Sequence, residues 1–98
     1  MKASIAIQSL PTAENETEML RIVDAVIAYI QSTGLHYVVT PFETVIEGDD
    51  LDQLLDIAKE CQHIAIREGA TKLACYMKLW YQADDKLLTI EQKTAKFA

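Results

Sequence analysis

The chain has 98 residues, half of them apolar, and it carries a formal net charge of −6. A chain of this length is expected to fold as one domain, which we place at residues 1–98. Its nine basic residues are outnumbered by fifteen acidic ones. This balance disfavours nucleic acid and anionic membrane surfaces, because recognition of phosphate needs clustered Lys and Arg. The high apolar share predicts that some apolar surface is buried against other subunits.

The N-terminal stretch and the cysteines predict a cytoplasmic protein. Gln8 and Pro11 interrupt the first apolar stretch too early for a secretory signal peptide, and no apolar run approaches the roughly 20 residues that span a bilayer. Cys61 and Cys75 form no C-x-x-C pair and cannot build a disulfide framework. A reducing compartment is the simplest interpretation.

The first third of the chain predicts a strand followed by a helix. Apolar residues alternate with small or polar ones over Ser4–Leu10, as in a strand with one apolar face, and Pro11 is expected to end it. Asn15 can cap a helix, with Glu18 three residues later completing a capping pair, and Gly34 is expected to stop this helix in a left-handed conformation. Five residues at helical spacing form its expected apolar stripe: Leu20, Val23, Val26, Ile27 and Ile30.

Two short extended segments come next. They cover Tyr37–Thr40 and Glu43–Glu47, with Pro41 between them and Gly48 after them. Proline has no amide hydrogen to donate, so it suits a turn or a sheet edge. This segment is therefore predicted to form a hairpin.

The last part of the chain predicts a second helix, a strand and a short terminal helix. Asp49 or Asp50 is expected to cap the second helix and Gly69 to end it. Lys72–Trp80 alternates as a strand, and the Thr-x-x-Gln pattern that begins at Thr89 opens the terminal helix. The expected buried stripe of the second helix has six members: Leu51, Leu54, Leu55, Ala58, Cys61 and Ala65.

The element order β-α-β-β-α-β predicts an α+β, ferredoxin-like fold. It has a four-stranded antiparallel sheet, two helices on one face and a short C-terminal helix. The other sheet face is left uncovered, and exposed apolar patches usually mark association surfaces. We expect sheet-to-sheet pairing to build a homo-oligomer, with the terminal helix as a further contact. The uncovered face is expected to carry Ser4, Ala6, Gln8, Ala74, Tyr76 and Trp80.

The sequence offers no catalytic or metal-binding pattern. Cys61 and His63 lie two apart on a helix and point apart, and His36 and Cys75 are remote from them, so no zinc spacing is present. There is no nucleophile motif, P-loop or G-x-G-x-x-G. We therefore expect neither an enzyme nor a metal or catalytic cofactor. Acidic side chains between Arg21 and Lys59 are explained in part by helix dipoles.

The hairpin segment from Thr40 to Gly48 combines hydroxyls, carboxylates and an aromatic ring, Phe42. An aromatic surface with a few orienting polar groups suits a flat heteroaromatic ligand. Carboxylates on this segment, such as Glu47, are either solvated edge residues or ligands for a cationic group. On the residues alone, base rates favour the solvated edge residue.

The segment Gly34 to Asp49, reading GLHYVVTPFETVIEGD, resembles the signature of the small thiamine-binding proteins related to YkoF. That signature has a tyrosine, a turn with proline, then threonine and a Glu-Gly pair. The opening Ile7–Pro11 and the closing Leu88–Thr94 resemble the same family. The resemblance implies sheet-paired dimers, a tetramer that is a dimer of dimers, and non-catalytic binding of thiamine or its hydroxymethylpyrimidine part.

Carried over by position, the resemblance implies that Tyr37, Thr44 and Glu47 bind the ligand, with Gln8 on the neighbouring strand. Thr40 stands before the proline, where the family pattern has glycine. Removing the Glu47 charge is expected to weaken thiamine binding by at least about tenfold. The expected pocket lies near a subunit interface and has six residues: Gln8, Tyr37, Thr40, Phe42, Thr44 and Glu47.

Three alternatives remain at this point. The first is a regulatory module for another small metabolite, such as an amino acid, because ferredoxin-like dimers host many ligands. The second is a structural oligomer whose acidic face meets a basic protein partner. The third is an enzyme that uses His36 or His63 as a base.

Overall fold

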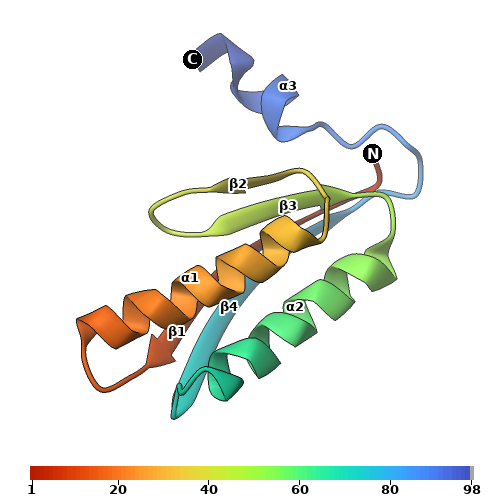
Figure 1. Cartoon of the computed structure of the whole chain (residues 1–98). Coiled ribbons are helices and arrows are strands. Elements are labelled where there is room, and N and C mark those ends of the chain that lie inside the picture. Colours follow the sequence, from red (N-terminus) through yellow and green to blue (C-terminus); the bar gives the residue numbers. More distant parts are fainter. Residues whose placement is uncertain (98) are drawn as a thin grey trace.

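The computed structural model describes residues 1–97, which form one four-stranded sheet with two long helices on one face (Figure 1). The elements follow one another in the predicted order. They are β1 Ala3–Thr12, α1 Glu16–Ser32, β2 Tyr37–Val39, β3 Thr44–Gly48, α2 Leu51–Arg67, β4 Lys72–Tyr81, α3 Ile90–Thr94 and the 3₁₀ turn η1 Ala95–Phe97.

The strands lie in the order β2-β3-β1-β4, and all neighbouring pairs are antiparallel. This is the predicted ferredoxin-like α+β fold. β1 pairs with β4 over its whole length, from Ala3 opposite Tyr81 to Thr12 opposite Lys72. It pairs with β3 only up to Ile7, opposite Thr44. The distal half of β1, residues 8–12, therefore has one neighbouring strand instead of two.

Pro11 does not end β1 as expected but lies within it, opposite Leu73. Backbone groups in an antiparallel ladder alternate between the two sides. The amide of Gln82 donates to the carbonyl of Lys2, so the even residues of β1 face β4 and the odd ones face away. The nitrogen of Pro11 therefore points to the side that β3 has already left, where no ladder donor is needed.

Helix α1 is capped as predicted but packs differently along its apolar side. The Asn15 side chain accepts a hydrogen bond from the amide of Glu18, and Gly34 follows the helix with a φ of 78°. Ile22, which the predicted stripe omitted, is buried in the core together with two members of that stripe, Val26 and Ile30. Leu20 is 51% exposed.

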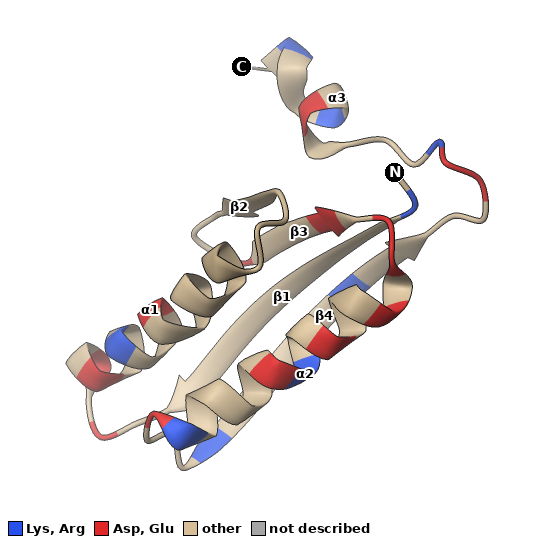
Figure 2. Ribbon diagram, turned by 45° about the vertical axis from the view of Figure 1, so that its right-hand side comes forward, with Lys and Arg blue, Asp and Glu red and all other residues tan. Residues whose placement is uncertain are grey.

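Helix α2 begins at the second of the two candidate caps. The Asp50 carboxylate accepts from the amides of Asp52 and Gln53, and Gly69 ends the turn with a φ of 114°. Leu55, expected in the core, is 44% exposed, whereas Ile57 is buried. The buried residues Leu54, Ile57, Ala58 and Cys61 recur at spacings of three and four, and Leu55, one position after Leu54, lies off that side of the helix. Figure 2 shows the outer side of α2 banded with charge.

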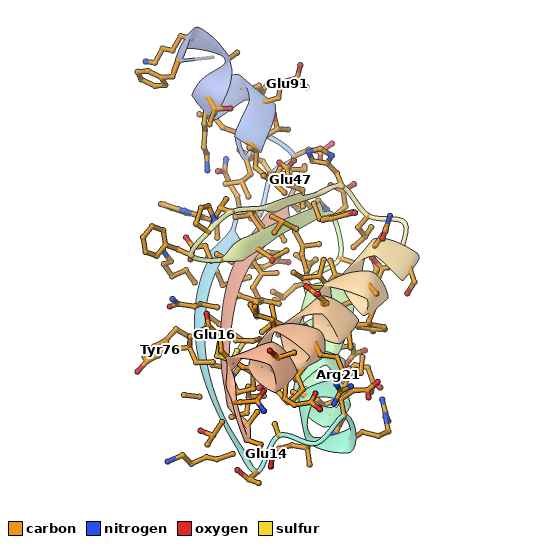
Figure 3. All side chains as sticks on the ribbon, turned by 60° about the vertical axis from the view of Figure 1, so that its left-hand side comes forward. Glu14, Glu16, Arg21, Glu47, Tyr76 and Glu91 are labelled. Carbon is orange, nitrogen blue, oxygen red and sulfur yellow. The ribbon has the colours of Figure 1, made fainter. Side chains whose placement is uncertain are left out.

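The sheet face opposite the helices is the open face. Cross-strand pairs place Ser4 beside Trp80 and Gln8 beside Tyr76 on it, as the alternation predicted. Tyr76 and Trp80 are 64% and 66% exposed, and Figure 3 shows Tyr76 directed away from the helices. The C-terminal α3 lies apart from α1 and α2 (Figure 1), and its Ile90 and Lys93 contact Glu47 and Trp80 at one end of the open face. In residues 1–97, no helix is long and apolar enough to cross a membrane.

Candidate functional site

A cavity of about 220 Å³ lies between α1 and the β2–β3 hairpin, beside the distal half of β1. We call it the hairpin cavity. It opens where β1 continues past the end of β3 while α1 still covers the sheet. Its wall contains four of the six predicted site residues, Gln8, Thr40, Phe42 and Thr44. The remaining lining residues are Ile7, Ser9, Leu10, Met19, Leu20, Val23, Val26, Ile27, Ile30, Val39, Pro41 and Glu43.

Thr40 shapes the hairpin turn. Its hydroxyl donates to the carbonyl of Glu43 at 2.7 Å and accepts from the amides of Phe42 and Glu43 at 3.3 and 3.0 Å. The backbone amide of Thr40 also donates to the Glu43 carbonyl. Among the described residues only glycines have a positive φ. Thr40 therefore does not adopt the left-handed conformation that favours glycine, and threonine fits at this position. The Thr40 side chain is thus engaged in holding the turn.

Thr44 and Gln8 contribute to the cavity unequally. Thr44 pairs with Ile7, a core residue, so it lies on the helix side of the sheet, and it is buried. Gln8 pairs with Tyr76, and strand alternation sends its side chain towards the open face. Of these two, Thr44 is the one whose side chain faces the space under α1.

The mouth of the hairpin cavity is apolar and exposed. Phe42 is 78% exposed and Leu20 on α1 is 51% exposed. Glu43 is the one ionisable residue among the described lining residues, and its carboxylate lies 3.0 Å from the Lys78 ammonium group. The cavity therefore presents hydroxyls and apolar surface, with no unpaired charge.

Tyr37 and Glu47 lie elsewhere. Tyr37 pairs with Ile46 and packs against the hydrophobic core. Glu47 pairs with Ser4 on the open face, and residues 44 and 47 necessarily face opposite sides of a strand. The structure thus separates Glu47 from Thr44, although the sequence placed both in one pocket.

Glu47 is a buried carboxylate with its own partners. It accepts a hydrogen bond from the amide of Ile90 at 2.9 Å, and its other oxygen lies 3.4 Å from His36 Nε2. Figure 3 shows Glu47 at the hairpin edge nearest to α3. It lines a second cavity of about 520 Å³, whose wall also includes His36, Asp49 and Glu91. We call this the carboxylate cavity.

The carboxylate cavity does not present a metal site. Asp50 is occupied in capping α2, and Asp49 accepts a hydrogen bond from the amide of Lys2 at 3.1 Å. No group of three His, Cys, Asp or Glu side chains in residues 1–97 is arranged to hold a metal ion. Of the acidic residues in the carboxylate cavity, Asp50 caps α2 and Glu47 anchors α3.

Two features of the hairpin cavity were not predicted from the sequence. The first is the α1 wall: Leu20, Val23 and Ile27 belonged to the predicted core stripe, but they line the cavity instead. An apolar stripe wider than one packing surface was the available signal. The second is Ser9, which carries no motif and whose position only the sheet register reveals.

A ferredoxin-like sheet with a small, apolar, hydroxyl-bearing cavity is an architecture that can hold a small molecule. Residues 5–98 match the family described as thiamine-binding protein. The chain belongs to this family.

Its relatives share the full length of the fold. A UPF0045 protein of Clostridium perfringens is 37% identical over 96% of this chain and 95% of its own. A Bacillus cereus domain of unknown function, DUF77, is 28% identical with a TM-score of 0.87, covering 100% of this chain and 91% of that one. A Thermotoga maritima protein assigned provisionally to thiamine biosynthesis or salvage is 26% identical, with a TM-score of 0.85 and complete coverage of both chains.

Proposed function

We propose that this protein binds thiamine or its hydroxymethylpyrimidine moiety as a cytoplasmic homo-oligomer, without catalysing a reaction. Thiamine is here a bound ligand, not a cofactor of a reaction in this protein. Membership of the thiamine-binding family supports the ligand class. The two free cysteines are consistent with a reducing compartment.

The hairpin cavity carries the proposal. Pockets for drug-sized ligands usually measure roughly 300 Å³ or more, whereas this one has about 220 Å³. Such a volume suits one flat ring. Apolar walls with a few orienting hydroxyls are the lining expected for a neutral heteroaromatic ring, and Phe42 at the mouth offers a surface for stacking.

The proposal orients the ligand with its pyrimidine ring inside. A cationic thiazolium would lose hydration in a cavity without an unpaired carboxylate, which is costly. The neutral aminopyrimidine pays no such cost when its polar groups find partners. In intact thiamine, the thiazolium therefore extends past Phe42 into solvent or towards a neighbouring subunit.

Isothermal titration calorimetry with thiamine and with hydroxymethylpyrimidine tests this function. We expect both to bind with similar, micromolar or tighter affinity, near one site per subunit, because the buried ring is common to them. Amino acids, run in parallel, should produce no heat. Absence of heat and of thermal shift with both pyrimidine ligands would refute the proposal.

Replacing Phe42 tests the location of the site. Phe42→Ala should weaken binding roughly 2- to 12-fold, the range for one aromatic contact. Phe97→Ala is the matched control, because Phe97 has the same 78% exposure but lies outside the cavity. Equal affinity in both variants would place the ligand elsewhere.

The Glu47→Gln variant decides between the two cavities. If the ligand occupies the hairpin cavity alone, affinity changes little, because Glu47 lies on the other sheet face. A loss of tenfold or more, the loss expected from the sequence, would place the cationic ring against Glu47 in the carboxylate cavity. Glu47→Gln and the wild type should be compared at equal fractions of folded protein.

A further inference from the structure

Ser9 is the residue of the hairpin cavity whose side-chain oxygen is buried without a hydrogen-bond partner. Its Oγ is buried, and among the described residues it is the one buried side-chain nitrogen or oxygen that forms no hydrogen bond. Buried polar groups are nearly always satisfied in native proteins, and exceptions call for a functional or structural reason. Ser9 lines the hairpin cavity.

The register of the sheet fixes where Ser9 points. Ser9 pairs with Cys75, which packs against the core, so its side chain lies on the helix side with Ile5 and Ile7. The helix above it is α1, whose Val23 and Ile27 face the same cavity. The hydroxyl therefore lies buried on the helix side of the sheet, at a residue that lines the hairpin cavity.

The backbone of Ser9 faces the same gap. Odd residues of β1 direct their amide and carbonyl towards β3, as the pairs Ile5–Ile46 and Ile7–Thr44 show. The pairing stops at Thr44, so the position that would face Ser9 is taken by the hairpin turn. The Ser9 amide and carbonyl thus lie in the plane of the sheet beside the hairpin turn, and its side chain projects from the same position on the helix side.

We infer that Ser9 is the polar anchor of the hairpin cavity and reads the edge of an aminopyrimidine ring. This inference rests on the proposed function. The amino group of such a ring donates and the adjacent ring nitrogen accepts, which complements a strand edge offering a carbonyl and an amide. The Ser9 hydroxyl both donates and accepts, so it supplies the third contact. The Thr40 hydroxyl already makes its hydrogen bonds within the turn, so Ser9 and Thr44 are the residues that orient the ring.

The Ser9→Ala variant tests the inference, with Ser4→Ala as a matched control from the opposite face of the same strand. Titration with hydroxymethylpyrimidine should show a loss of roughly 2- to 12-fold for Ser9→Ala, the range for one hydrogen bond, and no change for Ser4→Ala. Wild-type affinity in Ser9→Ala would overturn the inference while leaving the proposed function intact. A wild-type protein that does not bind the ligand would refute the proposed function instead.

An unfolding experiment without ligand provides an independent outcome. Removing a buried hydroxyl that has no partner should not destabilise the fold, because its desolvation is uncompensated. Ser9→Ala should therefore melt at or above the wild-type temperature while binding more weakly. A clear drop in its melting temperature, beyond that of Ser4→Ala, would show that the hydroxyl serves the fold and would overturn its assignment to the ligand.

Discussion

Cys61 shows how burial changes the chemistry of a single side chain. It is completely buried between α2 and the sheet, and burial raises the pKa of its thiol from 9.0 to about 12. A thiol in such surroundings stays protonated and unreactive at neutral pH. Cys61 therefore contributes to the core and not to redox chemistry.

This pKa predicts a loss of stability in alkali. Below pH 9 the thiol is protonated in both folded and unfolded chains, so its contribution to stability is complete. Between the unfolded value of 9.0 and the folded value of about 12, only the unfolded chain releases the proton. The free energy of unfolding should then fall by up to about 1.4 kcal/mol per pH unit from this group.

Urea unfolding at several pH values checks the effect. Other groups also titrate in alkali, so the informative quantity is the difference between wild type and Cys61→Ala. The variant should start from lower stability, because it leaves a cavity, but lose less of it above pH 9. Parallel slopes in the two proteins would contradict the assignment.

At the scale of elements, α3 depends on a contact made outside it. Five residues are too few for a helix to persist alone in water, although Thr89 and Gln92 form a reciprocal capping box. The amide of Ile90 donates to Glu47 across 43 positions in the chain. The Lys93 ammonium lies 5.8 Å from the Trp80 ring, which adds a weaker contact to the sheet.

Glu47→Ala should release α3. We expect faster amide hydrogen exchange over residues 90–94, with α1 and α2 unaffected, because their caps and core contacts are separate. Glu91→Ala serves as the control, since it removes an exposed carboxylate from the same helix. Unchanged exchange in Glu47→Ala would mean that the contact with Trp80 suffices to hold α3.

Arg21 links the two long helices, and Figure 3 shows it on α1. Arg21 donates to the Glu68 carbonyl at 2.6 Å, and its guanidinium also pairs with the carboxylates of Glu18 and Glu68. These carboxylates raise the pKa of Arg21. The link joins the start of α1 to the end of α2.

For the whole molecule, the subunit covers the open face only at one end, where Glu47 is buried and accepts a hydrogen bond from α3. Strand β4 is an edge strand of ten residues, and its side chains are exposed on both faces, including Met77 at 51% and Trp80 at 66%. A long, apolar edge is a hazard for a monomer. We therefore expect sheet pairing between subunits to cover it.

Light scattering after size-exclusion chromatography tests this expectation. The wild type should elute with a mass that is a multiple of the 11.0 kDa subunit, and Tyr76→Glu should shift it to smaller species by placing a charge on the open face. Ile66→Glu is the control, an exposed apolar position on α2. A wild-type monomer at all concentrations would contradict the expected pairing.

Local chemistry determined the elements of this protein. Asn15, Asp50 and Thr89 cap helices through contacts with residues at most three positions away, and Gly34 and Gly69 supply positive φ angles. Such interactions are written in short stretches of sequence, and so is the alternation that defines the strands. Together with the rule for split βαβ units, they were sufficient to predict the ferredoxin-like fold.

The tertiary structure decided the site, because the site depends on where one strand stops beside another. Because β3 begins only at Thr44, opposite Ile7, the last residues of β1 have no strand beside them on that side. Pro11 can therefore stay within β1, and the hairpin cavity opens beside Ser9. The same register sends Thr44 and Glu47 to opposite faces. The β1–β3 pairs join residues 37 to 45 positions apart in the chain. No local pattern of side chains acts over such distances, and only the folded sheet fixes these pairs.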